Sequence, residues 1–337
     1  MSLRDAIEFA VRGEEVPGEV LEDAFGEIMD GEAAPALVAG LLTALRTKGE
    51  TVGEIVAAAR ALRERAVTVP CPVAGAIDTC GTGGDGAETF NISTTAAFVA
   101  AGAGVPVAKH GNRAASSRSG SADVLEALGV RIDLPVDEAA DVLEDVGISF
   151  FFARLAHPAM RHVAPVREAL GIRTLMNCLG PLLNPLGVKL QLVGVYADEL
   201  VETLAAALGE LGALRALVVH GSDGLDELTT MGSSRAALIE DDGMHDFHVD
   251  PQAYDLPAPV AGALRGGDAR ENAKILREVL EGEVGARRDV VVLNAGAALW
   301  VAGLAEDLAE GLVLARKSLD SGAALERLER LVKATHA

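Results

Sequence analysis

Beyond residue 75 the sequence alternates between short apolar runs and helical stretches, and this alternation restricts the chain to few folds. The runs rich in strand-forming residues cover 77–78, 105–108, 148–152, 192–196 and 216–220. The helical stretches between them cover 92–103, 122–128, 137–145 and 200–211. A repeated strand–loop–helix order is typical of a mostly parallel sheet covered by helices. We therefore expect an α/β domain that binds its ligands at the carboxyl ends of the strands.

Residues 1–66 differ from the rest, because their apolar side chains recur only at helical spacing. Thr51 and Glu54 stand at the spacing of a capping box, which predicts the start of a helix. The composition changes abruptly at residues 67–75, where we expect a hinge or linker. The predicted organisation is a small N-terminal α-helical domain over 1–66 and a larger α/β domain over 76–337. The larger domain is expected to contain a hairpin over 236–249 and helices beyond Gly267.

The length and the cysteine content bound the class of protein. A chain of 337 residues, half of them apolar, can bury a large core. No apolar run is long enough for a transmembrane helix, and the first residues are amphipathic and acidic, unlike a signal peptide. Cys71, Cys80 and Cys178 lack the spacing of a disulfide scaffold or a zinc ribbon. We expect a soluble, cytoplasmic protein without a membrane partner.

The formal net charge is −21, with 50 acidic and 29 basic residues. Such a field repels the phosphates of nucleic acids, so no nucleic-acid partner is expected. Two explanations of the acidic surface stay open. It is either an adaptation to a high-salt cytoplasm or the ordinary composition of an acidic bacterial enzyme.

A glycine-rich loop over 81–86 is the strongest functional signal. Glycine lets main-chain N–H groups approach a ligand, and a loop that leads into a helix N-terminus is a ready anion site. Thr89 and the run 91–94 follow it with further hydroxyl and amide groups. The alternative is a tight strand-to-helix turn capped by Asn91 or Ser93. The pattern matches neither GxxxxGK[ST] nor GxGxxG, so it predicts neither a nucleoside triphosphatase nor a dinucleotide site.

A second loop, over 109–117, carries the donors that phosphate oxygens prefer. They are Lys109, His110, Asn112, Arg113, Ser116 and Ser117. The alternative is a solvated basic loop, but these cations occur in an otherwise acidic chain. The two loops together predict a site for a phosphorylated small molecule.

Three further features have both a functional and an ordinary interpretation. Asp226 and Glu227 follow a predicted strand, where adjacent carboxylates suit Mg²⁺, although such a pair is usually a solvated surface. Arg167 could bind a carboxylate through its planar fork, or lie on the surface. His157 and His162 do not share a helix face, and the histidines of the hairpin are expected to be exposed. No metal is assigned to any histidine.

Six runs of this sequence resemble anthranilate phosphoribosyltransferases in order and approximate spacing. They are GTGGDG, TFNIST, KHGNRAASSRSGSADVLEALG, HPAMRHVAPVREALGIRT, NCLGPLLNP and GLDE. The resemblance extends from the N-terminal helices to the C-terminus. It implies a helical domain, joined by helices near 165–190, and a larger α/β domain. It further implies a homodimer through the helical domain. The implied reaction joins anthranilate and phosphoribosyl pyrophosphate to give N-(5-phosphoribosyl)anthranilate and pyrophosphate, with two Mg²⁺ ions per active site.

The resemblance also implies the site residues. Catalytic roles fall to Lys109, Asp226 and Glu227, and metal binding falls to Ser93, Asp226 and Glu227, which favours the functional interpretation of the acidic pair. Anthranilate is expected at Gly81, Asn112 and Arg167, with His110 close by. The residues implied for phosphoribosyl pyrophosphate are Gly81, Gly84, Asp85, Thr89, Asn91, Ile92, Ser93, Thr94, Lys109, His110, Gly111, Asn112, Arg113, Ala114, Ala115, Ser116, Ser117 and Ser121. Arg154 and Met176 depart from the family pattern, outside these positions.

Two other functions are weighed against this one. A pyrimidine-nucleoside phosphorylase shares the fold and a similar lysine–serine loop, but it has an additional C-terminal domain that we do not expect here. A non-catalytic relative that binds nucleic acid conflicts with the negative charge and the acidic pair. Open questions are the choice between Mg²⁺ and Mn²⁺, feedback by tryptophan, and association with anthranilate synthase.

Overall fold

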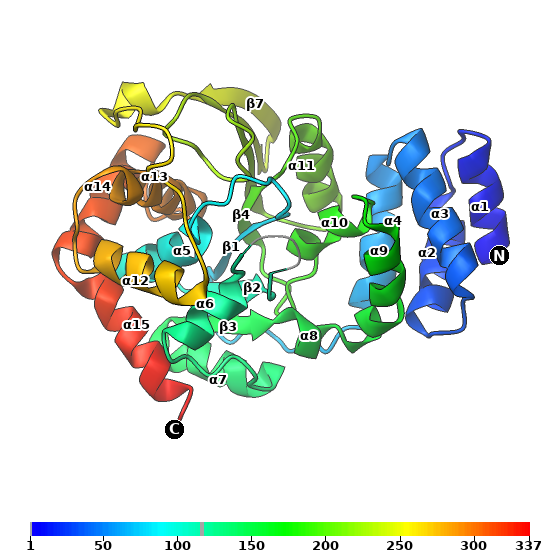
Figure 1. Ribbon diagram of the computed structural model, residues 1–337, viewed down its shortest axis with the longest axis horizontal. Helices are drawn as coiled ribbons and strands as arrows, with labels where there is room; N and C mark the ends of the chain where they lie inside the picture. Colours follow the sequence, from blue (N-terminus) through cyan, green and yellow to red (C-terminus); the bar gives the residue numbers. More distant parts are fainter. Residues whose placement is uncertain (1, 115–117) are drawn as a thin grey trace.

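A seven-stranded sheet runs through the larger lobe of the computed structural model, which describes residues 2–114 and 118–337 (Figure 1). The strands lie in the order β3-β2-β1-β4-β5-β6-β7. The first five in this order are mutually parallel, and β6 and β7 add an antiparallel hairpin beside β5. The strands are β1 (Ile77–Gly81), β2 (Val107–Gly111), β3 (Ile148–Phe152), β4 (Leu190–Gly194), β5 (Arg215–Gly221), β6 (Ser234–Glu240) and β7 (Gly243–Val249). The mostly parallel α/β sheet and the hairpin are as predicted.

The two central strands extend further than their side chains indicate. The prediction for β1 stopped at residue 78, yet Gly81 still pairs with Gly194 of β4. The prediction for β2 stopped at residue 108, yet Lys109 and His110 pair with β3. Backbone pairing on both sides holds these polar and glycine positions in the sheet, whatever their strand propensity. The strands therefore carry site residues directly to the edge of the sheet.

Successive side chains of a strand point to opposite faces, and the two faces have different cores. Leu217 and Val219 of β5 belong to one cluster, which the helices of the C-terminal third cover (Figure 1). Val218, between them, belongs to another. The helices packed into the first cluster are α5 (Ile92–Ala103), α6 (Ser121–Ala127), α12 (Ala269–Leu280), α13 (Ala286–Val301), α14 (Leu308–Asp320) and α15 (Ala323–Ala334).

The second cluster lies on the other face and continues into the helical lobe. Val193 and Val218 of the sheet share it with the helix α11 (Leu200–Glu210) and with the four N-terminal helices. These helices are α1 (Leu3–Val11), α2 (Gly18–Met29), α3 (Pro35–Lys48) and α4 (Val52–Arg63). The predicted capping box begins α4: the Glu54 N–H donates to Thr51 Oγ1 at 3.2 Å. The Glu54 carboxylate is buried and pairs with Lys48 at 2.8 Å.

The chain between β3 and β4 reaches across to the helical lobe and returns (Figure 1). Its helix α9 packs against α3, and α10 packs against α4. The elements of this connection are α8 (Ala153–Ala156), the 3₁₀ helix η1 (Pro158–His162), α9 (Ala164–Leu170), α10 (Met176–Leu179) and the 3₁₀ helix η2 (Gly180–Leu182). Arg167 is thus carried on a segment that touches the helical lobe.

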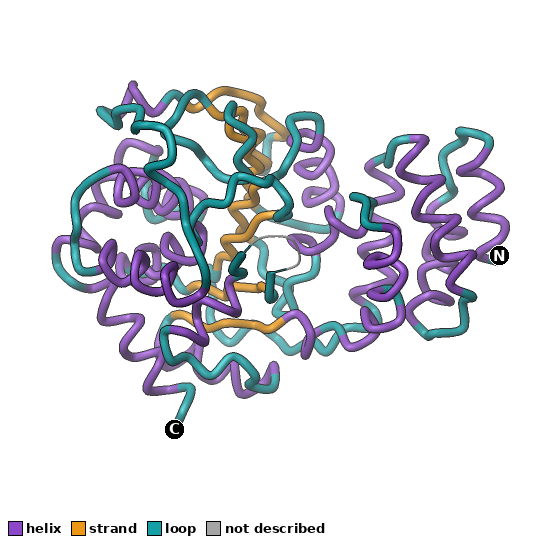
Figure 2. Tube along the Cα trace, in the orientation of Figure 1, coloured by secondary structure: helices purple, strands orange, loops and turns teal. Residues whose placement is uncertain are grey.

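The segment 67–75 is a loop that runs between the two lobes (Figure 2). It is packed along its path: the Val67 N–H donates to the Ala156 carbonyl at 2.8 Å, and Val69 and Val73 contact a third apolar cluster. That cluster covers the edge of the sheet together with the helix α7 (Val136–Val146). The 3₁₀ helix η3 (Pro251–Tyr254) follows β7.

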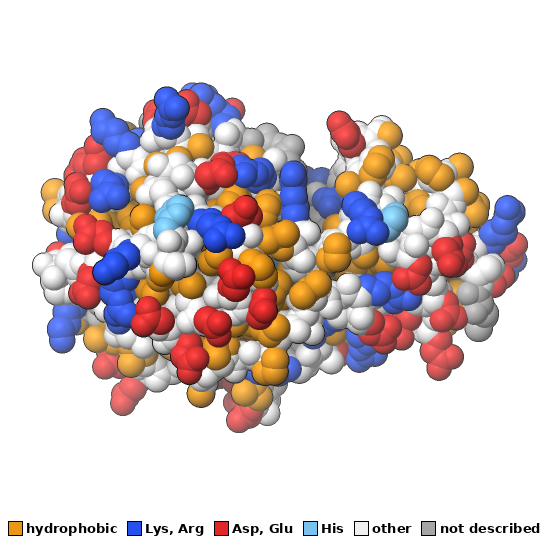
Figure 3. Space-filling view, turned by 90° about the horizontal axis from the view of Figure 1, so that it is seen from below, with side chains coloured by type: hydrophobic (Ala, Val, Ile, Leu, Met, Phe, Trp, Pro, Cys, Tyr) orange, Lys and Arg blue, Asp and Glu red, His pale blue; other side chains and the backbone are white. Residues whose placement is uncertain are grey.

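On the face of the molecule seen in Figure 3, acidic side chains occur in many places rather than in one patch. Figure 3 shows Asp and Glu side chains spread over both lobes, with Lys and Arg among them. Within the part of the chain that the structure describes, no helix has the length and apolar character needed to cross a bilayer.

Candidate active site

The carboxyl ends of β1 and β4 meet beneath the loop that carries Asp226, and the backbone passes very close to them. A Cβ atom at Gly194 would lie 1.6 Å from the Asp226 carbonyl oxygen. A Cβ atom at Gly81 would lie 2.4 Å from Asp226 Oδ2. Both positions therefore require glycine, because no side chain fits between strand and loop. Gly81 was predicted from the sequence, whereas Gly194 was missed since it looks like an ordinary strand residue.

Two hydrogen bonds join the glycine-rich loop and α5 to the acidic pair. The Gly83 N–H donates to Asp226 Oδ2 at 2.7 Å. The Ser93 N–H, in the first turn of α5, donates to Glu227 Oε1 at 3.0 Å. Asp85 lies on the same side, with its Oδ2 3.5 Å from the Asp226 backbone nitrogen. The structure thus brings together two features that the sequence analysis could only identify separately.

The three carboxylates are crowded; Glu227 is buried, and Asp85 and Asp226 are partly exposed. Burial, followed by the negative charges of Asp85 and Glu227, raises the pKa of Asp226 well above its ordinary range. Burial also raises the pKa of Glu227 to about 7. Buried carboxylates that repel one another are stabilised by a cation between them. The donor set consists of oxygen atoms, which suits Mg²⁺.

Lys109 lies beneath this group, in β2, with only 3% of its surface exposed. Its Nζ donates to the Thr79 carbonyl at 2.5 Å and lies 3.5 Å from Ser93 Oγ. Its charge acts against the rise in the pKa of Glu227 and of Asp78. Lys109 is therefore a buried cation that partly balances the carboxylates around it.

Asp78 is a buried carboxylate that the sequence analysis did not single out. Burial raises its pKa to about 6. The His110 N–H donates to its Oδ1 at 3.1 Å, and Asn184 Nδ2 donates to its Oδ2 at 2.9 Å. Asn184 also donates to the Ala108 carbonyl at 2.8 Å, so this amide links Asp78 of β1 to the backbone of β2. The signal for Asn184 was its place within the quoted run NCLGPLLNP.

His110 is buried at the end of β2, and its ring lies edge-on to that of His157, with the centroids 5.1 Å apart. Burial, and secondarily the neighbouring His157, lowers the pKa of His110 to about 3. His110 Nε2 has no hydrogen-bond partner among the described residues. His157 Nε2 lies 2.8 Å from the Leu183 carbonyl. Both rings are neutral near pH 7, so they supply polar atoms rather than charge.

The second loop is held by α6. Arg113 pairs with Asp123 at 2.9 Å and with Glu126 at 2.8 Å, so its guanidinium is engaged by α6 carboxylates. The exposed Asn112 accepts from Ser121 Oγ through its carbonyl at 3.3 Å. A Cβ atom at the predicted Gly111 would lie 2.2 Å from Ser121 Oγ. Ala114 donates its N–H to Asp123 Oδ2, while the predicted Ala115, Ser116 and Ser117 lie outside the described residues.

The residues at the start of α5 contact segments that are distant in the sequence. The Asn91 side chain does not cap the helix: its Nδ2 donates to the Ser119 carbonyl at 3.2 Å, and its Oδ1 accepts from Asn272 at 2.9 Å. Ile92 and Thr94 are buried. Thr89 forms an isolated bridge with Arg265 and lines a pocket of about 390 Å³. The Asn91 side chain therefore joins the segment after the second loop to α12 rather than capping α5.

Two arginines of the β3–β4 connection have different surroundings. Arg167, on α9, is half-buried, and its side chain has no hydrogen bond or ion pair with any described residue. Burial lowers its pKa from the ordinary value. Arg173 donates through Nη2 to the Gly84 carbonyl, and its guanidinium stands over the Tyr196 ring. Arg173 was not predicted from the sequence as a site residue, although it belongs to the same run, HPAMRHVAPVREALGIRT, as Arg167.

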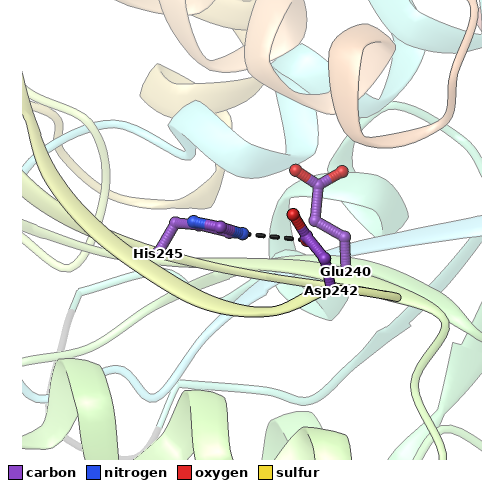
Figure 4. Close-up of side chains that lie close together, drawn as sticks. All are labelled: Glu240, Asp242 and His245. Carbon is purple, nitrogen blue, oxygen red and sulfur yellow. Dashed lines mark hydrogen bonds and ion pairs between the residues drawn. The ribbon is translucent and has the colours of Figure 1, made fainter.

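The hairpin holds a separate group of charged side chains, Glu240, Asp242 and His245, at its exposed tip (Figure 4). His245 Nε2 lies 2.9 Å from Asp242 Oδ1, and Glu240 pairs with Arg215 at 3.1 Å. His245 and His248 are exposed, as predicted. The ion pairs already balance two of these charges, and we assign no metal here.

The stability of the metal-free protein should fall as the pH rises from about 6.5 to about 8. The folded-state pKa values of Asp226 and Glu227 are raised, and that of Glu227 is about 7. Such groups stabilise the fold below their unfolded pKa and lose this contribution as the pH rises through the folded pKa. Below about pH 6.5, His110 and His157 act in the opposite direction. Their folded-state pKa values are lowered, to about 3 and about 4, so their contribution to stability falls as the pH falls.

Thermal melts between these two pH values provide the measurement. The wild-type Tm should fall with pH, and the Tm of Glu227→Gln should fall less. Added Mg²⁺ should flatten the wild-type curve, because the cation favours the ionised carboxylates. Equal slopes for wild type and variant would contradict the assignment of the titration to this site.

Fold and site together define an enzyme of the glycosyl transferase class with a separate helical bundle. Residues 74–325 match the model of the glycosyl transferase family a/b domain, and residues 4–66 match that of its helical bundle domain. The curated anthranilate phosphoribosyltransferase of Rubrobacter xylanophilus is 54% identical over 332 residues, which is 98% of this chain and 97% of that protein. The chain belongs to the anthranilate phosphoribosyltransferase family.

Solved structures agree over almost the whole chain. The crystal structure of anthranilate phosphoribosyltransferase from Thermus thermophilus has a TM-score of 0.93 at 46% identity, covering 99% of this chain and all of that one. The Saccharomyces cerevisiae enzyme in complex with phosphoribosyl pyrophosphate and Mg has a TM-score of 0.92 at 29% identity, covering 99% and 98%. The likeness includes both lobes, in agreement with the fold class expected from the sequence.

Proposed function

We propose that this protein transfers the 5-phosphoribosyl group of phosphoribosyl pyrophosphate to the amine of anthranilate. The products are N-(5-phosphoribosyl)anthranilate and pyrophosphate, and the reaction serves L-tryptophan biosynthesis. The observation that carries the proposal is the junction of the glycine-rich loop with the acidic pair, through Gly83 to Asp226 and Ser93 to Glu227. An anion cradle and a cation site then adjoin each other, which is what a metal-bound pyrophosphate requires.

Magnesium is assigned to Ser93, Asp226 and Glu227, with two ions per active site. The support is the crowding of buried oxygen donors, whose raised pKa values indicate a need for positive charge. The yeast relative crystallised with phosphoribosyl pyrophosphate and Mg points the same way. A bound Mg²⁺ would neutralise the negative charge that develops on the departing pyrophosphate.

This chain's own residues bind and orient the phosphorylated substrate. The glycine-rich loop and the first turn of α5 bind phosphate oxygens through main-chain N–H groups other than those of Gly83 and Ser93, which donate to the acidic pair. Lys109 contributes a buried positive charge next to Ser93, where negative charge develops as pyrophosphate departs. The aromatic amine loses its proton as the new bond forms, so positioning and charge stabilisation carry the reaction without a strong general base.

Anthranilate is assigned to Gly81, Asn112, His110 and Arg167. The unpaired, half-buried guanidinium of Arg167 supports this, because a desolvated arginine binds a carboxylate more strongly than an exposed one. Arg167→Ala should raise the KM for anthranilate about 10- to 100-fold, the loss expected for a charge-assisted hydrogen bond. The KM for phosphoribosyl pyrophosphate should change far less.

Steady-state kinetics with each substrate varied in turn test the role of Arg167. Arg161→Ala is the matched control, since Arg161 is an exposed arginine of the same connection. Equal effects of Arg167→Ala on both KM values would refute the anthranilate assignment.

One assay separates the proposed reaction from its rivals. Anthranilate fluorescence should disappear only when phosphoribosyl pyrophosphate and Mg²⁺ are both present. Thymidine phosphorolysis without this activity would indicate a pyrimidine-nucleoside phosphorylase, and DNA binding without it a non-catalytic relative.

A homodimer formed through the helical lobe is part of the proposal. The sequence resemblance to anthranilate phosphoribosyltransferases supports it. Light scattering of the purified protein measures the mass. A cytoplasmic location is proposed too, because the phosphorylated substrate is charged and does not cross a bilayer unaided.

A further inference from the structure

Arg173 connects two parts of the site that are distant in sequence. It follows α9, the helix of Arg167, and its side chain is exposed. Its Nη2 donates to the Gly84 carbonyl in the glycine-rich loop. A Cβ atom at Gly84 would lie 3.6 Å from Arg173 Nε, so the guanidinium rests against the loop backbone itself.

The Tyr196 ring, over which the Arg173 guanidinium lies, is held in place by its own contacts. The Arg173 Cζ lies 4.3 Å from the centroid of Tyr196, within the range of a cation–π contact. Tyr196 is 8% exposed, and its N–H donates to Thr82 Oγ1 at 3.1 Å. Its hydroxyl lies 3.9 Å from Cys178 Sγ of α10. The ring is therefore anchored both to the start of the glycine-rich loop and to the helical side.

The glycine-rich loop is thus held from two sides. Asp226 accepts from the Gly83 N–H, and Arg173 donates to the Gly84 carbonyl of the next residue. Gly83 and Gly84 both have positive φ, 68° and 78°, which glycine adopts at no cost but which leaves the loop many alternative conformations. Fixing such a loop in advance lowers the entropy that substrate binding must overcome.

We propose that Arg173 is a positioning residue that latches the glycine-rich loop in its binding conformation. It does so by stacking on Tyr196 while donating to Gly84, and so ties the phosphoribosyl pyrophosphate loop to the segment that carries Arg167. The inference rests on the proposed function for its choice of substrate. A planar guanidinium can stack and donate at the same time, which a lysine ammonium cannot.

The kinetic test uses the full-length protein with Arg173→Ala and Arg173→Lys. Both variants should raise the KM for phosphoribosyl pyrophosphate about 10-fold, as expected for the loss of one charge-assisted hydrogen bond. The kcat and the KM for anthranilate should stay within about 2-fold of wild type, below the level of a single lost contact. Arg161→Ala is the matched control. Equal rises in both KM values, or full activity of Arg173→Lys, would overturn the proposal.

A second measurement does not depend on activity. Amide hydrogen exchange of the ligand-free protein should accelerate in residues 82–87 of Arg173→Ala and remain unchanged in α13. Tyr196→Phe, which keeps the ring, should exchange like wild type, and Tyr196→Leu should exchange like Arg173→Ala. Unchanged exchange rates in residues 82–87 of Arg173→Ala would contradict the proposed role of Arg173. If wild type consumes no anthranilate, the proposed function fails, while the exchange experiment still decides the latch.

Discussion

Asp226→Asn should lose at least about 100-fold in kcat/KM, since replacement of a supporting ligand alone costs 10- to 100-fold. The same variant should nevertheless melt at a higher temperature than wild type in the absence of Mg²⁺. The asparagine oxygen can still accept from the Gly83 N–H, so the loop contact is kept. What disappears is a buried negative charge beside Asp85 and Glu227. Removing repulsion at a functional site commonly stabilises a fold at the expense of activity.

The prediction for Asp226→Asn is tested by an activity measurement and a stability measurement. Initial rates at saturating Mg²⁺ give the loss of activity, and thermal melts in a chelator give the gain in Tm at about pH 8. Asp241→Asn, at the exposed hairpin turn, is the control and should change neither. A lower Tm for Asp226→Asn would contradict the interpretation that these carboxylates repel one another in the metal-free protein.

Lys109→Met should destabilise the protein by about 3–5 kcal/mol, the loss expected when one partner of a buried charge pair is removed. Lys109 is the cation that opposes the rise in the pKa of both Asp78 and Glu227. The loss should shrink as the pH falls from about 8 to about 5, because both carboxyls, with pKa values of about 6 and about 7, then become protonated. Activity should be lost as well, since the charge next to the leaving group is gone.

Denaturant unfolding at the two pH values measures this effect. Lys189→Met, an exposed lysine just before β4, is the control and should change the free energy of unfolding little at either pH. A loss that is the same at both pH values would indicate that Lys109 contributes packing rather than charge.

Helices with strong periodicity or clear ends could be predicted closely from the sequence. The helix over 92–103 and the strand over 148–152 have the observed bounds of α5 and β3. The ends of β1 and β2 could not be predicted, because glycine, lysine and histidine carry no strand signal. Their conformation is imposed by neighbouring strands that are far away in sequence.

The parts of the site could be predicted better than their arrangement. Gly83 and Asp226 are 143 residues apart, so their hydrogen bond follows only from the strand order. The same limit explains why Asn184 and Arg173 were missed: each acts on a partner from another segment. Arg113 was assigned to the substrate as one of the donors of the loop 109–117, and the structure gives it in addition two acidic neighbours on α6.

The second apolar cluster has a consequence for how the two lobes can move. It is one continuous core that contains Phe25 of α2 and Leu62 of α4 as well as Val193 and Val218 of the sheet. A swinging rotation about residues 67–75 would pull this core apart and expose its side chains to water, at a cost of about 25 cal/mol for each Å². Small sliding of packed helices keeps the side chains buried. We therefore expect substrate-linked motion to be a small shear between packed helices such as α4 and α11, rather than a hinge rotation.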